Sequence, residues 1–183
     1  MPILARKKTD HEQLPANYGD LMIQGLRGES HSASFTLAPT TDASDESSFA
    51  SIFNNGSHFR LEGLETFLQG VVPRREAISN GVAQVTIDIS TSGVYADIQY
   101  GKIFHFTSLA RQVRLTYEIS ESGTIGATLV HAIFPQSQHA EPTPFTQWTV
   151  KLQNPNDLDL RNLSSVELHW KGNARFVEAG PTT

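Results

Sequence analysis

Apolar and polar residues alternate strictly in several short segments of this chain. In 147–152 and in 165–171, every second residue is apolar. This period of two is typical of a β-strand that has one buried side and one solvent-facing side. The same alternation recurs in 82–90, 94–100 and 111–119. The chain is therefore predicted to be rich in half-buried antiparallel strands.

Turn signals separate these segments. Ser92-Gly93 and Ser122-Gly123 both place a glycine where the chain would reverse, and glycine adopts the left-handed backbone that tight turns need. The second turn predicts a hairpin in which 124–134 pairs with 111–119. Roughly eight to ten short strands follow from this reading, with no alternation of strands and long helices. The predicted fold class is all-β, an antiparallel β-sandwich or jelly roll.

One long strand candidate changes phase within its length. Phe59 and Leu61 share one face of the predicted strand, whereas Leu64 and Leu68 lie on the other. The phase changes at Gly63. A glycine at a phase change predicts a β-bulge or a bend.

One short helix is predicted near residues 44–54. Phe49, Ile52 and Phe53 follow the helical spacing i, i+3, i+4. Ser44 is a suitable N-cap because its hydroxyl can accept a hydrogen bond from a backbone N–H of the first turn.

The domain organisation is predicted from the same patterns. Residues 1–20 are polar, contain two prolines and show no sustained period, which indicates a flexible N-terminal tail. Residues 21–26 are predicted to form a short strand. A single β-sandwich domain is expected over 21–179, because a chain of 183 residues is long enough for one core.

The composition of the chain argues against several kinds of partner and site. The net charge is −5 and the lysines and arginines are scattered, which argues against nucleic-acid binding. The chain contains no cysteine, so disulfides and thiolate metal sites are excluded. No apolar run has membrane-spanning length, and the N-terminus lacks the apolar region of a secretory signal. We therefore expect a cytoplasmic protein or one exported without a cleaved signal.

Two sequence features are candidates for a metal site. His105 and His131 both fall in predicted strands and can meet across a sheet, but a packed or solvent-facing histidine is the commoner case. Residues 154–159 alternate asparagine and aspartate, which suits calcium, yet the run lacks the glycine and terminal glutamate of a calcium loop and favours a turn. No GxSxG, HExxH or phosphate-binding glycine motif occurs. We therefore expect no catalytic residue, no cofactor and no metal.

Aromatic residues offer a different kind of site. Trp148 and Trp170 are in phase with aliphatic neighbours, which predicts core positions. Tyr95 lies on the face opposite to its apolar neighbours and is predicted to be exposed. Tyr95, Tyr100 or the polar loop 135–143 can provide a binding surface for a sugar.

The C-terminal third carries a resemblance to a known family. Its anchors are, in order, Pro144-Phe145, Trp148, Leu152, the acidic run 157–159, Leu163 to Val166, Leu168-His169 and Ala174-Arg175. This order resembles the C-terminal β-sandwich of the A component of Tc insecticidal toxin complexes, and the resemblance extends over roughly residues 59–176. It implies a terminal module that packs on a partner component and has no catalytic residues. It assigns no individual binding residue.

These observations together predict a non-enzymatic β-sandwich interaction module. Its expected partner is a protein, within a toxin-like or secreted assembly. The alternative is a carbohydrate-binding, lectin-like β-sandwich with a glycan as its partner. A second alternative is a viral or phage structural jelly roll, in which exposed edge strands would support self-assembly.

Overall fold

The alternating segments form two facing β-sheets. The computed structural model describes residues 3–13, 16–39, 56–134 and 143–177. The smaller sheet has the strand order β1–β11–β3, with β1 (Ile3–Gln13), β11 (Ser165–Val177) and β3 (Gly56–Gln69). The larger sheet has the order β2–β9–β5–β7–β8, and β6 pairs with β5 outside this path. Its strands are β2 (Ser32–Thr36), β9 (Thr146–Leu152), β5 (Val82–Gln99), β7 (Gln112–Ser120), β8 (Ile125–Val130) and β6 (Lys102–Thr107).

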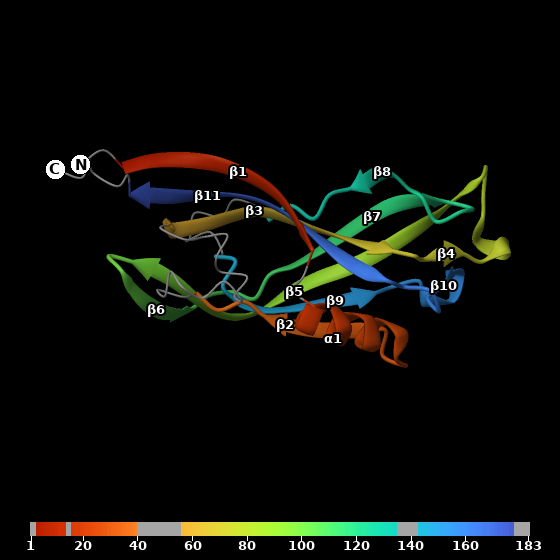
Figure 1. The fold of residues 1–183 in the computed structure, drawn as a ribbon, viewed down its shortest axis with the longest axis horizontal. Coiled ribbons are helices and arrows are strands. Elements are labelled where there is room, and N and C mark those ends of the chain that lie inside the picture. Colours follow the sequence, from red (N-terminus) through yellow and green to blue (C-terminus); the bar gives the residue numbers. More distant parts are fainter. Residues whose placement is uncertain (1–2, 14–15, 40–55, 135–142, 178–183) are drawn as a thin grey trace.

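Short elements complete the fold. Strand β4 (Val72–Pro73) pairs with β10 (Leu158–Asp159) at one end of the molecule (Figure 1). The 3-10 turns η2 (Arg75–Ala77) and η3 (Pro155–Asp157) lie beside this pair in the sequence. Helix α1 (Ala16–Arg27) lies against β2 at the edge of the larger sheet (Figure 1). All the strand pairings of the two sheets are antiparallel, and the predicted all-β sandwich architecture is confirmed.

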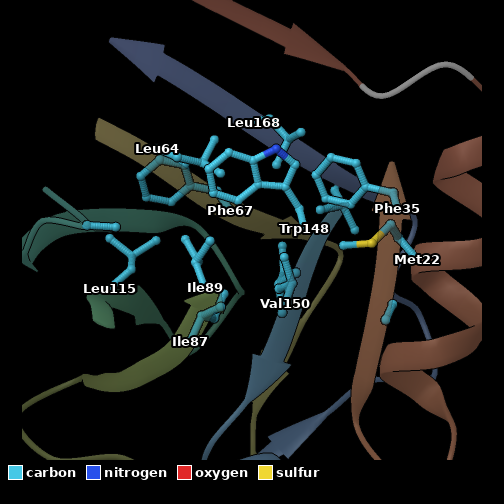
Figure 2. Packing of buried hydrophobic residues seen from close by; sticks show 14 of the residues in the cluster. Met22, Phe35, Leu64, Phe67, Ile87, Ile89, Leu115, Trp148, Val150 and Leu168 are labelled. Atoms are coloured by element: carbon cyan, nitrogen blue, oxygen red, sulfur yellow. The ribbon is translucent and has the colours of Figure 1, made fainter. Parts of the chain in front are cut away.

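The core lies between the two sheets. Trp148 and Trp170 are 0% and 4% exposed, and their rings meet edge to face at 5.9 Å between centroids. Figure 2 shows Trp148 at the centre of the core, near Phe35, Phe67 and Leu168. The alternation in β7, β9 and β11 thus corresponds to one buried face on each strand, as the sequence pattern predicted.

The N-terminal residues depart from the prediction of a flexible tail over 1–20. Strand β1 pairs with β11 from Ile3↔Val177 to Gln13↔Glu167. An edge strand needs only backbone N–H and C=O groups to pair, so it can form without an apolar stripe of its own. Because this segment is polar and has no period of two, its sequence did not predict the strand.

The predicted short strand over 21–26 is also wrong, because these residues belong to α1. Met22 and Leu26, one helical turn apart, are both fully buried. A six-residue segment with four large apolar residues is too short to separate a period of two from a period of 3.6. The helix predicted over 44–54 lies outside the described residues. Among the described residues, no helix is long and apolar enough to cross a membrane.

A glycine controls how closely α1 approaches β2. A Cβ added to Gly25 would lie 2.6 Å from the carbonyl oxygen of Ser32 and 2.7 Å from the Cβ of Ala33. We expect Gly25→Ala to lower the free energy of unfolding by about 2 kcal/mol, because overpacking outweighs the better helix propensity of alanine. Urea denaturation followed by far-UV circular dichroism measures the change. The exposed neighbour Gln24, replaced by alanine, is the control and should change stability by less than about 0.5 kcal/mol; a stabilising Gly25→Ala would contradict this packing.

The phase change in β3 coincides with a bulge. Lys171 of β11 pairs with Gly63, but the next residue, Gly172, pairs with Leu61, so Glu62 is the extra residue in the register of β3 against β11. The extra residue moves the buried positions from one parity to the other along β3. The bulge predicted at Gly63 is therefore confirmed.

Strand β5 runs through the turn that was predicted at Ser92-Gly93. Gly93 has the left-handed φ of +83° expected of a turn glycine, yet the strand continues to Gln99. The pairing of β5 with β9 is irregular between Thr91 and Tyr95. The glycine thus accommodates a local irregularity within one long strand, and the second half of β5 extends beyond β7 to pair with β6. This extension forms the hairpin described next.

Candidate functional site

An exposed apolar hairpin is the most distinctive surface of the molecule. It comprises the second half of β5, the turn at Tyr100-Gly101 and all of β6, and we call residues 94–107 the apolar arm. Its turn residue Tyr100 is 90% exposed. The other large exposed apolar side chains of the arm are Val94, Ile103 and Phe104, at 54%, 39% and 46%.

The arm is apolar on both of its faces. Neighbouring residues of a strand point to opposite sides, so Ile103 and Phe104 lie on different faces of β6. Their cross-strand partners on β5 are Ile98 and Asp97. Figure 1 shows β6 at one end of the elongated molecule, the end at which β1 begins and β11 ends. The arm therefore presents apolar side chains on either side of a two-stranded ribbon.

A buried carboxylate fixes the base of the arm to the smaller sheet. Asp97 is 1% exposed, and its Oδ1 accepts hydrogen bonds from the backbone N–H groups of Phe59 at 3.2 Å and Ile98 at 2.8 Å. The Arg60 guanidinium donates to Oδ2 at 3.1 Å. One carboxylate thus joins β5 to β3. This linkage holds the arm in a defined position relative to the core.

Tyr95 does not have the exposed position that its sequence phase suggested. It is 1% exposed, its ring stacks on Phe106 at 5.6 Å, and its hydroxyl donates to the Leu109 carbonyl at 3.1 Å. The physical reason is the continuity of β5. The buried odd-numbered phase of Val85 and Ile87 extends through the glycine to Tyr95. A sugar platform containing Tyr95 is therefore ruled out by its burial.

The other aromatic residues considered for sugar stacking differ in their exposure. Tyr100 is exposed, and its ring meets His58 edge to face at 6.1 Å. Of the loop 135–143, residues 135–142 lie outside the described residues, and Thr143 is buried with its hydroxyl donating to the Ala96 carbonyl at 2.5 Å. Trp148 and Trp170 are core residues, as predicted.

The two strand histidines have different surroundings. His105 is an exposed residue of β6, whereas His131 follows β8 and is hydrogen-bonded to Glu65 of β3. No hydrogen bond or ring contact joins the two histidines within the described ranges. No group of three or more metal-ligating side chains is present in those ranges either.

The 154–159 segment forms a turn whose asparagine is committed to backbone contacts. The side-chain amide of Asn154 donates to the Gln84 carbonyl at 2.8 Å and accepts from the Thr86 N–H at 3.0 Å. Asp159 is bound by Arg161 in a bidentate pair, which lowers the pKa of Asp159 to about 2. These oxygens have protein partners, and the segment contains η3 and β10, in agreement with the predicted turn.

Two further groups with shifted pKa values have structural partners. The hydrogen bond from Arg114 lowers the pKa of Asp88, which lies opposite it across β5 and β7. Burial raises the pKa of Tyr117, whose hydroxyl accepts the Leu68 N–H at 3.0 Å and so links the two sheets. Each shift follows from a contact that holds strands together.

A second exposed apolar strip lies at the edge of the larger sheet. Strand β8 ends the strand order of that sheet, and Leu129, Val130 and Ile133 are 46%, 50% and 62% exposed. The strip differs from the arm because β8 pairs along β7 in the body of the sheet. It offers a matched control for the arm.

Sequence reasoning missed the arm as a site, although one signal was present. Residues 103 and 104 are consecutive large apolar residues in a segment bounded by turns, which breaks strict alternation. Such a break marks a strand that is either buried on both faces or apolar on an exposed face. Only the position of β6 beyond β7 decides between the two.

Comparisons with known proteins assign no family to this chain. No protein-family model matches it, and no curated protein matches it. Among solved structures, the empty head of turnip yellow mosaic virus at 100 K is similar over 100% of this chain and 87% of that chain, with 9% sequence identity and a TM-score of 0.30. A TM-score this low carries no argument about function.

Proposed function

We propose that this protein is a non-enzymatic interaction module that binds a partner protein through the apolar arm. The observation that carries the proposal is the exposure of Val94, Tyr100, Ile103 and Phe104 on one two-stranded hairpin. Large apolar side chains gathered on an exposed surface lose unfavourable contact with water when a partner covers them. The buried Asp97 linkage holds this surface in place before binding, which reduces the entropy lost in the complex.

The form of the arm favours an extended partner segment. Within the described ranges, no strand pairs with the outer edge of β6, so its outward N–H and C=O groups can pair with an added strand. The side chains of such a strand would meet apolar residues on both faces of the arm. The ionisable residues of β6 are Lys102 and His105. The expected partner segment therefore alternates apolar residues with acidic ones.

The resemblance of the C-terminal third to the Tc toxin A component suggests the kind of assembly to which this partner belongs. In that family the similar module packs on another component of the complex. We propose that the partner belongs to a toxin-like or secreted assembly. Co-purification of the full chain with such a component would support this assignment, and failure to co-purify with any toxin component would count against it.

A peptide selection tests the arm directly. Displayed decapeptides are selected on the intact protein, and binding of enriched peptides is measured by fluorescence anisotropy. We expect enrichment of peptides that alternate apolar and acidic residues, and about tenfold or greater weakening in the double variant Ile103→Ser, Phe104→Ser. The matched control is Leu129→Ser, Val130→Ser, which removes two exposed apolar residues from β8 and should retain binding.

Two results would reject the proposed binding mode. Peptides that bind the arm variant and the wild type equally would place the site elsewhere. Arm-dependent dimerisation, seen as a doubled mass in light scattering, would make a second copy of this chain the occupant and favour a self-assembling structural protein.

Glycan binding is a second candidate function, favoured by one observation. The Tyr100 ring is 90% exposed at the turn of the arm, where it is accessible for stacking on a sugar. A glycan panel read by thermal shift should then give a response that Tyr100→Ala abolishes. A flat response across the panel would reject this candidate.

A further inference from the structure

A second site lies at the opposite end of the molecule from the arm. A cleft of about 790 Å³ opens beside the β4–β10 pair, which Figure 1 shows far from β6. The volume lies within the range of small-molecule binding sites in proteins, roughly 300–1,000 Å³. Its walls come from the end of α1, the η2 turn and the 155–161 segment.

The cleft carries positive charge on a protein that is negative as a whole. Four arginines line it, together with one glutamate and one aspartate, so its net charge is +2 when His31 is neutral. The whole chain has a net charge of −5. A second cleft of about 660 Å³, lined by the other side of the Asn154–Asp157 turn, contains Glu118 and Asp157 and no basic residue. Positive charge is therefore concentrated in the first cleft.

The arginines differ in how many N–H donors remain for a ligand. Arg27 is largely committed, because it donates to the backbone carbonyls of Leu160, Arg161 and Leu163. Arg161 is paired with Asp159. The side chain of Arg74 donates only through Nε, to the Leu158 carbonyl at 3.1 Å. Within the described ranges, the side chain of Arg75 has no hydrogen bond or ion pair.

Arg74 is held in place by hydrogen bonds to the 155–161 segment, which forms another wall of the cleft. Its backbone N–H donates to the Asp157 carbonyl at 2.8 Å, and its side chain reaches Leu158. Its two terminal nitrogens have no partner within the described part of the chain. A guanidinium fixed through Nε presents its terminal N–H groups in a defined direction, which suits bidentate binding of an oxyanion.

We propose that this cleft binds an oxyanion of the phosphate class, with Arg74 and Arg75 as its main donors. Arg27 adds charge while holding α1 against the Leu160–Leu163 segment. Asp159 and Arg161 are paired with each other, so together they add no net charge to the cleft. The cleft is open to solvent, which predicts modest affinity that weakens as salt concentration rises.

Isothermal titration calorimetry of the full chain tests the site with three probes. These are inorganic phosphate, pyrophosphate and glucose 6-phosphate, each at low and at high sodium chloride. We expect pyrophosphate to bind more tightly than inorganic phosphate, because it can engage both arginines. Stronger binding of glucose 6-phosphate than of inorganic phosphate would assign the site to phosphorylated small molecules, and the reverse order to free phosphate.

Charge-matched variants separate the cleft from a general electrostatic effect. Arg75→Gln should weaken pyrophosphate binding about tenfold, whereas Arg114→Gln, which removes the same charge from β7, should leave it unchanged. Arg75→Lys should restore part of the affinity by retaining the charge without the forked donor. Equal losses in Arg75→Gln and Arg114→Gln, or no binding by the wild type, would overturn the proposal. Either result leaves the peptide test of the arm unaffected.

Discussion

Replacing Trp148 with alanine is expected to lower the free energy of unfolding by about 4 kcal/mol, within the range found for large aromatic residues in protein cores. Trp148 is fully buried, and its ring contacts those of Phe134 and Trp170 at 5.8 and 5.9 Å between centroids. Its indole N–H donates to the Pro144 carbonyl at 2.9 Å, which ties the start of β9 to the core. Alanine would leave a cavity between the two sheets and remove one of the two donors to the Pro144 carbonyl, which keeps the hydrogen bond from the Thr146 N–H.

Urea denaturation followed by far-UV circular dichroism measures this loss without relying on tryptophan fluorescence. Trp148→Phe is the graded variant, because it retains most of the ring contacts and lacks the N–H donor. It should lose less than half as much stability as Trp148→Ala. Tyr100→Ala is the surface control, with an expected change below about 0.5 kcal/mol. A loss below about 1.5 kcal/mol for Trp148→Ala would show that the indole does not fill the space between the sheets.

The second large effect is expected for Asp97→Ala, at about 3 kcal/mol. The substitution removes the acceptor for the Phe59 and Ile98 N–H groups and the partner of Arg60. Buried N–H groups that lose their acceptor retain the cost of leaving water, which is about 1–3 kcal/mol for each group. Because Asp97 joins β5 to β3 at the base of the arm, the variant should also weaken arm-dependent peptide binding.

A second aspartate on the same strand provides the control for Asp97. Asp88 is also on β5, but its carboxylate pairs with the largely exposed Arg114 side chain across the sheet. Asp88 is itself only 11% exposed, but water can solvate Arg114 when its partner is removed, so Asp88→Ala should cost less than Asp97→Ala in the same urea titration. Similar losses for the two variants would mean that the backbone contacts of Asp97 are not the source of its effect.

The main strands could be predicted because a buried face repeats every second residue. The alternation of β7, β9 and β11 survives in the structure, and so do the core positions of both tryptophans. The β3 bulge was visible for the same reason, since an extra residue shifts the phase of the pattern. Each of these features changes the spacing of apolar residues along the sequence and can therefore be predicted from it.

The errors arose where backbone pairing or a neighbouring strand decided the outcome. Strand β1 forms through main-chain hydrogen bonds to β11, which place no demand on side-chain pattern. Tyr95 is buried because β5 continues past Gly93, although a glycine with positive φ suits both a turn and an irregular strand. Neither outcome follows from local propensity.

The sequence by itself determined the all-β class, the core faces of the main strands and the absence of disulfides. These depend on residue types and on their period along the chain. Only the tertiary structure decided the two candidate sites. The arm is exposed because β6 pairs with β5 beyond the end of β7, and the basic cleft exists because α1, η2 and the 155–161 segment meet at one end. The cleft joins residues far apart in sequence. The arm is one continuous hairpin, but its exposure depends on which strands lie beside it.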